Sequence, residues 1–137
     1  MPELLDTNVI VRYLVESQES IPERFRGVFP FFDRVERGDV RVSLPPLVVF
    51  QTFFVLTSYY EVPVAQAAGK LEALLSFKGI RISEKDIVRT CLRLLQERDF
   101  DLVDAYIVSH SRAKGYRGVY SFDGDLQAFG LELLPVE

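Results

Sequence analysis

Short apolar runs alternate along the chain with longer stretches in which apolar residues recur every three or four positions. The short runs predict buried strands, at residues 3–6, 40–44, 80–82, 118–122 and 131–134. The longer stretches predict helices, because that spacing places apolar side chains on one helix face. We expect these helices at residues 7–16, 22–37, 46–60, 63–78, 83–98 and 102–114.

Prolines and glycines refine the boundaries of these elements. Pro22 suits the first turn of a helix that Gly38 should stop, and Pro30 should kink or split that helix. Pro46 opens a helix that is apolar nearly all round. We therefore expect this helix at the centre of the core or beneath a partner chain.

Strands separated by helices predict an α/β fold with a parallel sheet covered on both faces. The chain has 137 residues, which predicts a single domain spanning residues 1–137. Hydrophobic residues make up 48% and charged residues 26%, which excludes disordered, collagen-like and low-complexity classes. The single cysteine, Cys91, excludes an internal disulfide and a cysteine-rich zinc site. The single histidine, His110, argues against a multi-histidine metal site.

The formal net charge is −4, which argues against broad nonspecific nucleic-acid binding but leaves room for a local basic rim. The N-terminus has no basic segment followed by an apolar one, as a secretion signal would have. The most apolar stretch, residues 44–60, is too short and too polar to span a membrane. We therefore expect a soluble cytoplasmic protein without membrane association.

Carboxylates occupy the positions where chemistry is expected. Asp6 ends the first strand, Asp123 follows the fourth, and Asp104 lies in the first turn of a helix. Ligands gather at the carboxyl ends of parallel strands, so these side chains are candidates for one site. Clustered carboxylates need a proton or a cation, and oxygen ligands alone favour Mg²⁺ or Mn²⁺. Such a site suits phosphoester hydrolysis, although an aspartate after a strand also serves as a helix cap.

Three segments in order resemble PIN-domain proteins, especially the VapC-type toxins of toxin–antitoxin pairs. They are LLDTNVIVRYL (4–14), LVDAYIVSHSRAKG (102–115) and VYSFDGDL (119–126), the last with Ser121 where the family usually has threonine. The resemblance implies a three-layer α/β/α sandwich with a short, mostly parallel central sheet. It also implies a metal-dependent ribonuclease that holds Mg²⁺ or Mn²⁺ at Asp6, Asp104 and Asp123. An RNA substrate, a cognate antitoxin and a homodimer are its implied partners.

The chain departs from that family at Gln51, where the family usually has glutamate. An amide keeps a carbonyl oxygen but loses the charge, so the site should hold a cation less strongly. Two interpretations stay open: a nuclease with weaker metal affinity, or a catalytically impaired binding module retained for RNA or antitoxin. Asp101 and Asp125 are candidates for compensation, but their alternative roles are a helix cap and a solvated turn.

Other polar side chains are candidates for supporting roles. Thr7, Asn8 and Ser121 could orient the carboxylates, although Thr7 or Asn8 could equally cap the first helix. A basic set follows the acidic helix and could meet RNA phosphates or form a solvated face: Arg112, Lys114 and Arg117.

Two groups of aromatic residues have more than one interpretation. Four phenylalanines could stack on bases or belong to the core: Phe25, Phe29, Phe31 and Phe32. The aromatic residues of the apolar helix after Pro46 suggest that it lies in or near a dimer interface. Cys91 is expected in the core, and His110 as a surface or partly buried structural residue.

Two other kinds of acidic site compete with this interpretation, of which the phosphatase class also places an aspartate after the first strand. A haloacid-dehalogenase-like phosphatase needs a second aspartate two residues later, and Asn8 stands there. A receiver-type phosphoacceptor domain needs a lysine near the acidic edge, and no lysine precedes Lys70. Both classes are disfavoured.

Overall fold

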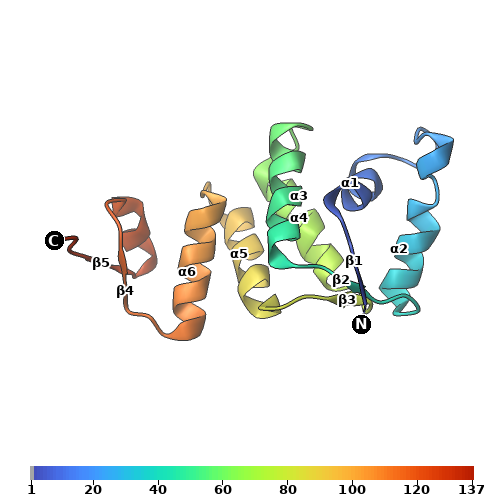
Figure 1. The fold of residues 1–137 in the computed structure, drawn as a ribbon. Helices are drawn as coiled ribbons and strands as arrows, with labels where there is room; N and C mark the ends of the chain where they lie inside the picture. The colour runs from blue at the N-terminus through green and yellow to red at the C-terminus, as the bar shows by residue number, and fades with distance from the viewer. Residues whose placement is uncertain (1) are drawn as a thin grey trace.

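A computed structural model describes residues 2–137 and confirms a mostly helical α/β fold with short parallel strands (Figure 1). The strands are β1 (Glu3–Leu4), β2 (Val42–Ser43), β3 (Ile80–Arg81), β4 (Gly118–Tyr120) and β5 (Glu132–Leu134). The helices are α1 (Thr7–Val15), α2 (Val28–Arg37), α3 (Pro46–Ser58), α4 (Val64–Leu75), α5 (Lys85–Glu97) and α6 (Leu102–Lys114). Two 3₁₀ segments complete the chain, η1 (Glu23–Phe25) and η2 (Gly124–Phe129).

The strands form two sheets. In the first sheet the order is β1-β2-β3, all parallel, with Leu4 opposite Ser43 and Val42 opposite Ile80. In the second, β4 pairs in parallel with β5, and Val119 lies opposite Leu133. The second sheet lies at one end of the molecule, and α5 and α6 stand between it and the first sheet, which α2 flanks on its other side (Figure 1). Parallel pairing agrees with the sequence pattern, but the strands that one central sheet would unite are divided.

The helices form a continuous packed series between the two sheets. Helix α3 packs against α1 and α4, and α5 packs along both α4 and α6. The largest fully buried side chains fill the space around the first sheet and these helices: Phe32, Ile10, Leu44, Leu56, Leu71, Leu74, Leu75, Leu92 and Leu95. Phe32 also stacks on Tyr13, with ring centroids 4.3 Å apart. Most of the apolar burial that stabilises the fold therefore belongs to residues 5–108.

The segment around Pro30 differs from the sequence expectation. The break that separates η1 from α2 falls at Arg26 and Gly27, and Pro30 lies inside the first turn of α2. A proline is tolerated there because the first-turn N–H groups have no partner within the helix. Gly38 ends α2 in the left-handed conformation, as expected.

Gly79 permits a close approach that fixes the third strand. A Cβ atom at this position would collide with the carbonyl oxygen of Val40. The Gly79 N–H donates to the Val35 carbonyl at 2.8 Å, and its carbonyl accepts from Val42 at 2.9 Å. This glycine therefore joins β3 to β2 and to the end of α2 at once.

The first sheet is incompletely covered. Successive side chains of a strand point to opposite faces. Leu5 is buried, but Leu4, on the other face, is 74% exposed. The expectation of a sheet covered on both faces therefore does not hold at β1. Among residues 2–137, no helix combines the length and the apolarity needed to cross a membrane.

Candidate active site

Two of the candidate carboxylates meet beside α6. Asp101 caps this helix, accepting from the Val103 N–H at 2.8 Å and the Asp104 N–H at 3.4 Å. Asp104 then lies in the first turn, and Asp123 follows β4 and caps η2 by accepting from the Asp125 N–H at 2.9 Å. The carboxylates of Asp104 and Asp123 lie close enough for Asp123 to raise the pKa of Asp104. The expected cap role of Asp101 is confirmed.

The electrostatics of this pair favour an added positive charge. The pKa of Asp104 is raised, first by partial burial and then by the negative charges of Asp101 and Asp123. The charge of Asp125 raises that pKa further. Carboxylates that crowd in this way are stabilised by a shared proton or by a cation.

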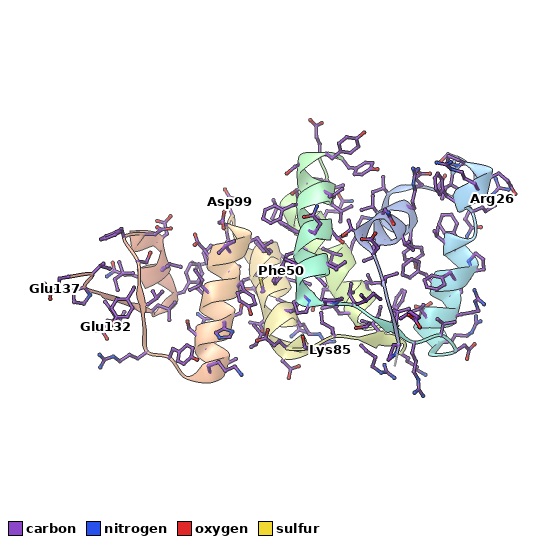
Figure 2. The ribbon with its side chains drawn as sticks, viewed as in Figure 1. Arg26, Phe50, Lys85, Asp99, Glu132 and Glu137 are labelled. Carbon is purple, nitrogen blue, oxygen red and sulfur yellow. The ribbon has the colours of Figure 1, made fainter. Side chains whose placement is uncertain are left out.

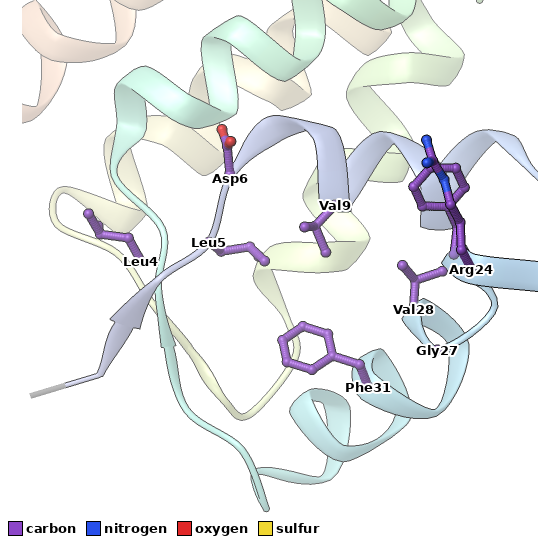
Figure 3. A pocket seen from close by; sticks show the side chains of 9 residues that line it. Leu4, Leu5, Asp6, Val9, Arg24, Gly27, Val28 and Phe31 are labelled. Atoms are coloured by element: carbon purple, nitrogen blue, oxygen red, sulfur yellow. The ribbon is translucent and has the colours of Figure 1, made fainter.

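Asp6 lies in the other part of the molecule, at the carboxyl end of β1. Its Oδ1 accepts from the Thr7 N–H at 2.7 Å, so Asp6 itself is the N-cap of α1. This corrects the expectation that Thr7 or Asn8 caps the helix. The Asp6 carboxylate is exposed, points away from Phe31 and lines the rim of a cavity of about 450 Å³ (Figure 3). Asp6 is not among the groups that shift the pKa of Asp104.

The donor set has the right chemistry for Mg²⁺ or Mn²⁺, which prefer carboxylate oxygens. The arrangement within one copy does not complete it. Among residues 2–137, no three His, Cys, Asp or Glu side chains come close enough together to hold a metal ion. Asp104 and Asp123 meet beside the second sheet, and Asp6 stands beside the first. A single copy of the chain therefore presents two parts of a candidate site.

Thr52 connects the Gln51 position to Asp6, and the sequence pattern did not reveal it. This side chain is fully buried and donates to the Val48 carbonyl at 2.7 Å and to Thr7 Oγ1 at 3.2 Å. The second bond joins α3 to the start of α1, directly after Asp6. Gln51, the residue before Thr52, is exposed on α3. The Thr52–Thr7 bond places this helix against the start of α1, next to Asp6. The only sequence signal was a hydroxyl within an otherwise apolar helix.

The other supporting candidates differ in their contacts. Ser121 Oγ accepts from the Asp123 N–H at 2.9 Å, so this serine does orient the loop that carries Asp123. Asn8 and Asp125 are exposed. Two basic candidates have local partners, because Arg112 donates to the Phe129 carbonyl at 3.1 Å and Arg117 lies 3.5 Å from Glu132.

A basic side chain lines the same cavity as Asp6. Arg24 lines the same cavity, and its guanidinium stands 4.4 Å from the centre of the Phe25 ring. Arg12 stands over the same ring at 3.9 Å. Arg12 is also ion-paired with Glu16, so Arg24 is the guanidinium of this pair that leaves its charge available.

The remaining singular residues are structural. Cys91 is fully buried in the core, and burial raises the pKa of its thiol to about 12. His110 is partly buried, and its Nδ1 lies 3.7 Å from Glu84 Oε2. Both expectations are confirmed. Of the four clustered phenylalanines, Phe32 is a core residue, and Phe25, Phe29 and Phe31 are partly buried.

The family profile of the PIN domain matches residues 4–131. The chain belongs to the PIN domain family. PIN domains are typically metal-dependent nucleases, and that class agrees with acidic side chains at strand ends. No curated protein matches this PIN-domain chain, and no solved structure does.

Proposed function

We propose that this PIN-domain chain is a metal-dependent endoribonuclease and the toxin of a VapBC-type toxin–antitoxin pair. The observation that carries the proposal is the approach of two carboxylates, Asp104 in the first turn of α6 and Asp123 after β4. Asp6 supplies a third carboxylate at the end of β1. All three lie within the segment that matches the PIN domain.

The charge of these carboxylates explains the proposed need for Mg²⁺ or Mn²⁺. An RNA phosphate would be repelled by Asp6, Asp104 and Asp123 unless a divalent cation neutralised them. Asp101 fixes the first turn of α6, and Ser121 fixes the loop before η2, so both carboxylates of the pair are held in place. Arg24 offers positive charge to the RNA backbone near Asp6.

Gln51 supports a weakened nuclease over a fully charged one. Its amide supplies one carbonyl oxygen and no charge at the position where glutamate is usual in the resembling toxins. We expect Gln51→Glu to tighten Mn²⁺ binding and to raise cleavage. If Gln51→Glu creates activity where the natural chain has none, the second candidate function holds, a binding module without useful catalysis.

An apolar groove beside the acidic pair supports a protein partner. The groove has a volume of about 420 Å³ and lies between α3 and α6. Its lining is almost entirely apolar: Leu47, Phe50, Phe54, Leu102, Val103 and Tyr106. Phe50 packs edge-on against Tyr106 across it, with ring centroids 5.4 Å apart. An antitoxin segment with apolar residues and a basic side chain near Asp104 would complement this surface.

The test is RNA cleavage by the purified, partner-free protein in Mn²⁺, in Mg²⁺ and in chelator. We expect cleavage only with the metals, reduced on the order of 100-fold or more in Asp123→Asn, the range for losing one charge-stabilising group. Asp33→Asn, an exposed aspartate on α2, is the matched control and should cleave normally. Cleavage in chelator, or equal cleavage by Asp123→Asn, would overturn the proposed chemistry.

The toxin role is tested separately in growing cells. Expression of the natural chain should arrest growth, and expression of Asp123→Asn at the same level should not. Continued growth under the natural chain, from protein shown to be active in the cleavage assay, would argue against a toxin.

A further inference from the structure

Each sheet has two edge strands, β1 and β3 in the first and β4 and β5 in the second, and strongly exposed apolar side chains lie at β1 and β4. β1 bonds only to β2, so its other edge has no strand partner among residues 2–137. β4 bonds only to β5 and likewise has one free edge within the described part of the chain. Unpaired edges are templates for adding a further strand.

Exposed apolar side chains accompany both free edges. Leu4 of β1 is 74% exposed, and Tyr120 and Phe122, at and after the end of β4, are 72% and 89% exposed. Beside β1 lies the cavity lined by Leu4, Leu5 and the apolar side chains of Val9, Val28 and Phe31 (Figure 3). Such surfaces are typical of a face that another protein segment covers.

The β4 strand of the same copy cannot reach this edge. Only residues 115–117 connect α6 to β4, so β4 must remain beside α6. α6 in turn packs along α5, and α5 along α4. Helices α5 and α6 stand between β4 and β1 (Figure 1), and Glu132 of β5 lies on the far side of α6 from Phe50 of α3 (Figure 2). Pairing of β4 with its own β1 would require that this helix packing be dismantled.

We propose that two copies of the chain exchange these edges, so that β4 of each copy pairs in parallel with β1 of the other. The result is a symmetric dimer with two continuous sheets of strand order β5-β4-β1-β2-β3, in which the first two strands come from the second copy. Such an exchange is isologous, because the same two edges are used on both copies.

The exchange completes the acidic site. Asp6 follows β1, and Asp123 follows β4, so parallel pairing brings both to one sheet edge. Asp104 lies beside Asp123 in the same copy and therefore accompanies it. Each site then takes Asp6 from one copy and Asp104 with Asp123 from the other. This assignment of residues to one site rests on the proposed function, whereas the strand exchange rests on the free edges of β1 and β4 and their exposed apolar side chains.

The negative charge of the carboxylates predicts that the exchanged dimer depends on a cation. Each copy has a net charge of −4, and the exchange brings further carboxylates together. Without a cation these carboxylates repel one another. We therefore expect Mn²⁺ to strengthen the dimer and chelator to weaken it, as measured by sedimentation velocity of the full chain.

A cross-linking experiment tests the exchange without using activity. The double variant Leu4→Cys/Tyr120→Cys places one thiol on each free edge, at positions that are exposed. Cys91 is fully buried and does not compete. Mild oxidation should give a covalent dimer on a non-reducing gel. A cross-linked monomer would show pairing within one copy, and no cross-link would show that the edges do not meet; either would overturn the proposal.

A matched variant controls for random collision. In Leu4→Cys/Leu47→Cys the second thiol lies on α3 at a leucine that is 78% exposed. This variant should stay largely monomeric under the same oxidation. Equal dimer yields from the two variants would mean that the cross-link reports encounter only, and the exchange would be rejected.

A mixing experiment tests the shared site. Asp6→Asn and Asp123→Asn should each be inactive alone. In a mixture, each mixed dimer has one site with all three carboxylates, so activity should return to about a quarter of the natural rate for random pairing in a symmetric dimer. Cross-linking with no return of activity would reject the shared site and keep the exchange. An inactive natural protein that still cross-links would reject only the proposed function.

Discussion

The two sheets of this molecule are built alike and buried very differently. Around the first sheet, Leu5, Val42, Leu44 and Ile80 are all buried, and the helices cover them. Around the second sheet, the buried side chains after β4 are Leu126 and Leu131. A two-stranded pair with so little core is marginally stable on its own. The first sheet is therefore stabilised by its own core, whereas the second depends on contacts with the helices and segments beside it.

One contact in particular holds the second sheet to the rest of the chain. The ring of Phe129 stacks on Phe100 with centroids 4.1 Å apart, and the guanidinium of Arg98 lies 4.9 Å from the centre of the same ring. Arg112 donates to the Phe129 carbonyl. Phe129 and its backbone therefore tie residues 116–137 both to α6 and to the segment before it.

The largest effect should come from the core of the first region. Phe32→Ala removes a fully buried ring that stacks on Tyr13 and should lower the free energy of unfolding by about 3–5 kcal/mol. Urea unfolding followed by circular dichroism measures it. Phe122→Ala, at 89% exposure, should change that free energy by less than about 0.5 kcal/mol in dilute monomer. Similar losses for both variants would contradict the comparison.

A smaller effect should come from the contact that holds the second sheet. Phe129→Ala should lower the free energy of unfolding by about 2 kcal/mol, because it removes a partly buried ring and its stacking on Phe100. Hydrogen exchange read by mass spectrometry should show faster exchange in residues 116–134 and unchanged exchange in α3 and α4. Faster exchange throughout the chain would mean that the second sheet unfolds only together with the first.

Loss of the N-cap of α6 should lower the free energy of unfolding about half as much as Phe129→Ala. Asp101→Ala leaves the N–H groups of Val103 and Asp104 without their acceptor and should cost about 1 kcal/mol. Thermal unfolding measures the loss. Asp101→Asn is the matched control, because asparagine also caps well and should restore most of the stability. An unchanged melting temperature for Asp101→Ala would contradict this role.

The smallest expected effect, that of Asp104→Asn, is a rise in the free energy of unfolding. The pKa of Asp104 is raised in the folded chain, so its ionised form is less favourable there than in the unfolded chain. The associated stability is present below the unfolded pKa and is lost as pH rises through the folded pKa. Asp104→Asn should therefore stabilise the metal-free monomer at pH 7 by roughly 0.5 kcal/mol, in the range for one partly exposed charge pair.

The pH dependence makes that prediction specific. The gain from Asp104→Asn should vanish below about pH 4, where the carboxyl is protonated in both states. Unfolding in urea at pH 7 and at pH 3.5 provides the comparison. A gain that persists at low pH would show that amide packing, and not charge, is the cause.

The sequence predicted the elements better than their assembly. The period of apolar residues located every strand and every α-helix, and the bounds of α6 agreed with the prediction. Gly38 and Gly115 ended their helices as expected, because each adopts the left-handed conformation that glycine permits. The division into two sheets was not predictable, since strand periodicity carries no information about which edges meet.

The candidate site was likewise predicted in its local features and not in its long-range contacts. Local spacing predicted where Asp6 and Asp123 lie relative to their strands, and the cap role of Asp101. The contact between Asp104 and Asp123 depends on the short connection after α6, and Thr52 acts on Thr7 across two helices. Long-range contacts of this kind depend on tertiary packing and not on the residues adjacent in sequence.

The most direct test of the account is Mn²⁺ binding by the natural chain, Asp6→Asn and Asp104→Asn, followed by electron paramagnetic resonance. The account holds that carboxylates of both sheets act on one cation. It predicts that each substitution weakens Mn²⁺ binding by at least about tenfold, as for other groups that support a metal site. If Asp104→Asn weakens binding and Asp6→Asn leaves it unchanged, the two sheets do not share a site and the account is contradicted.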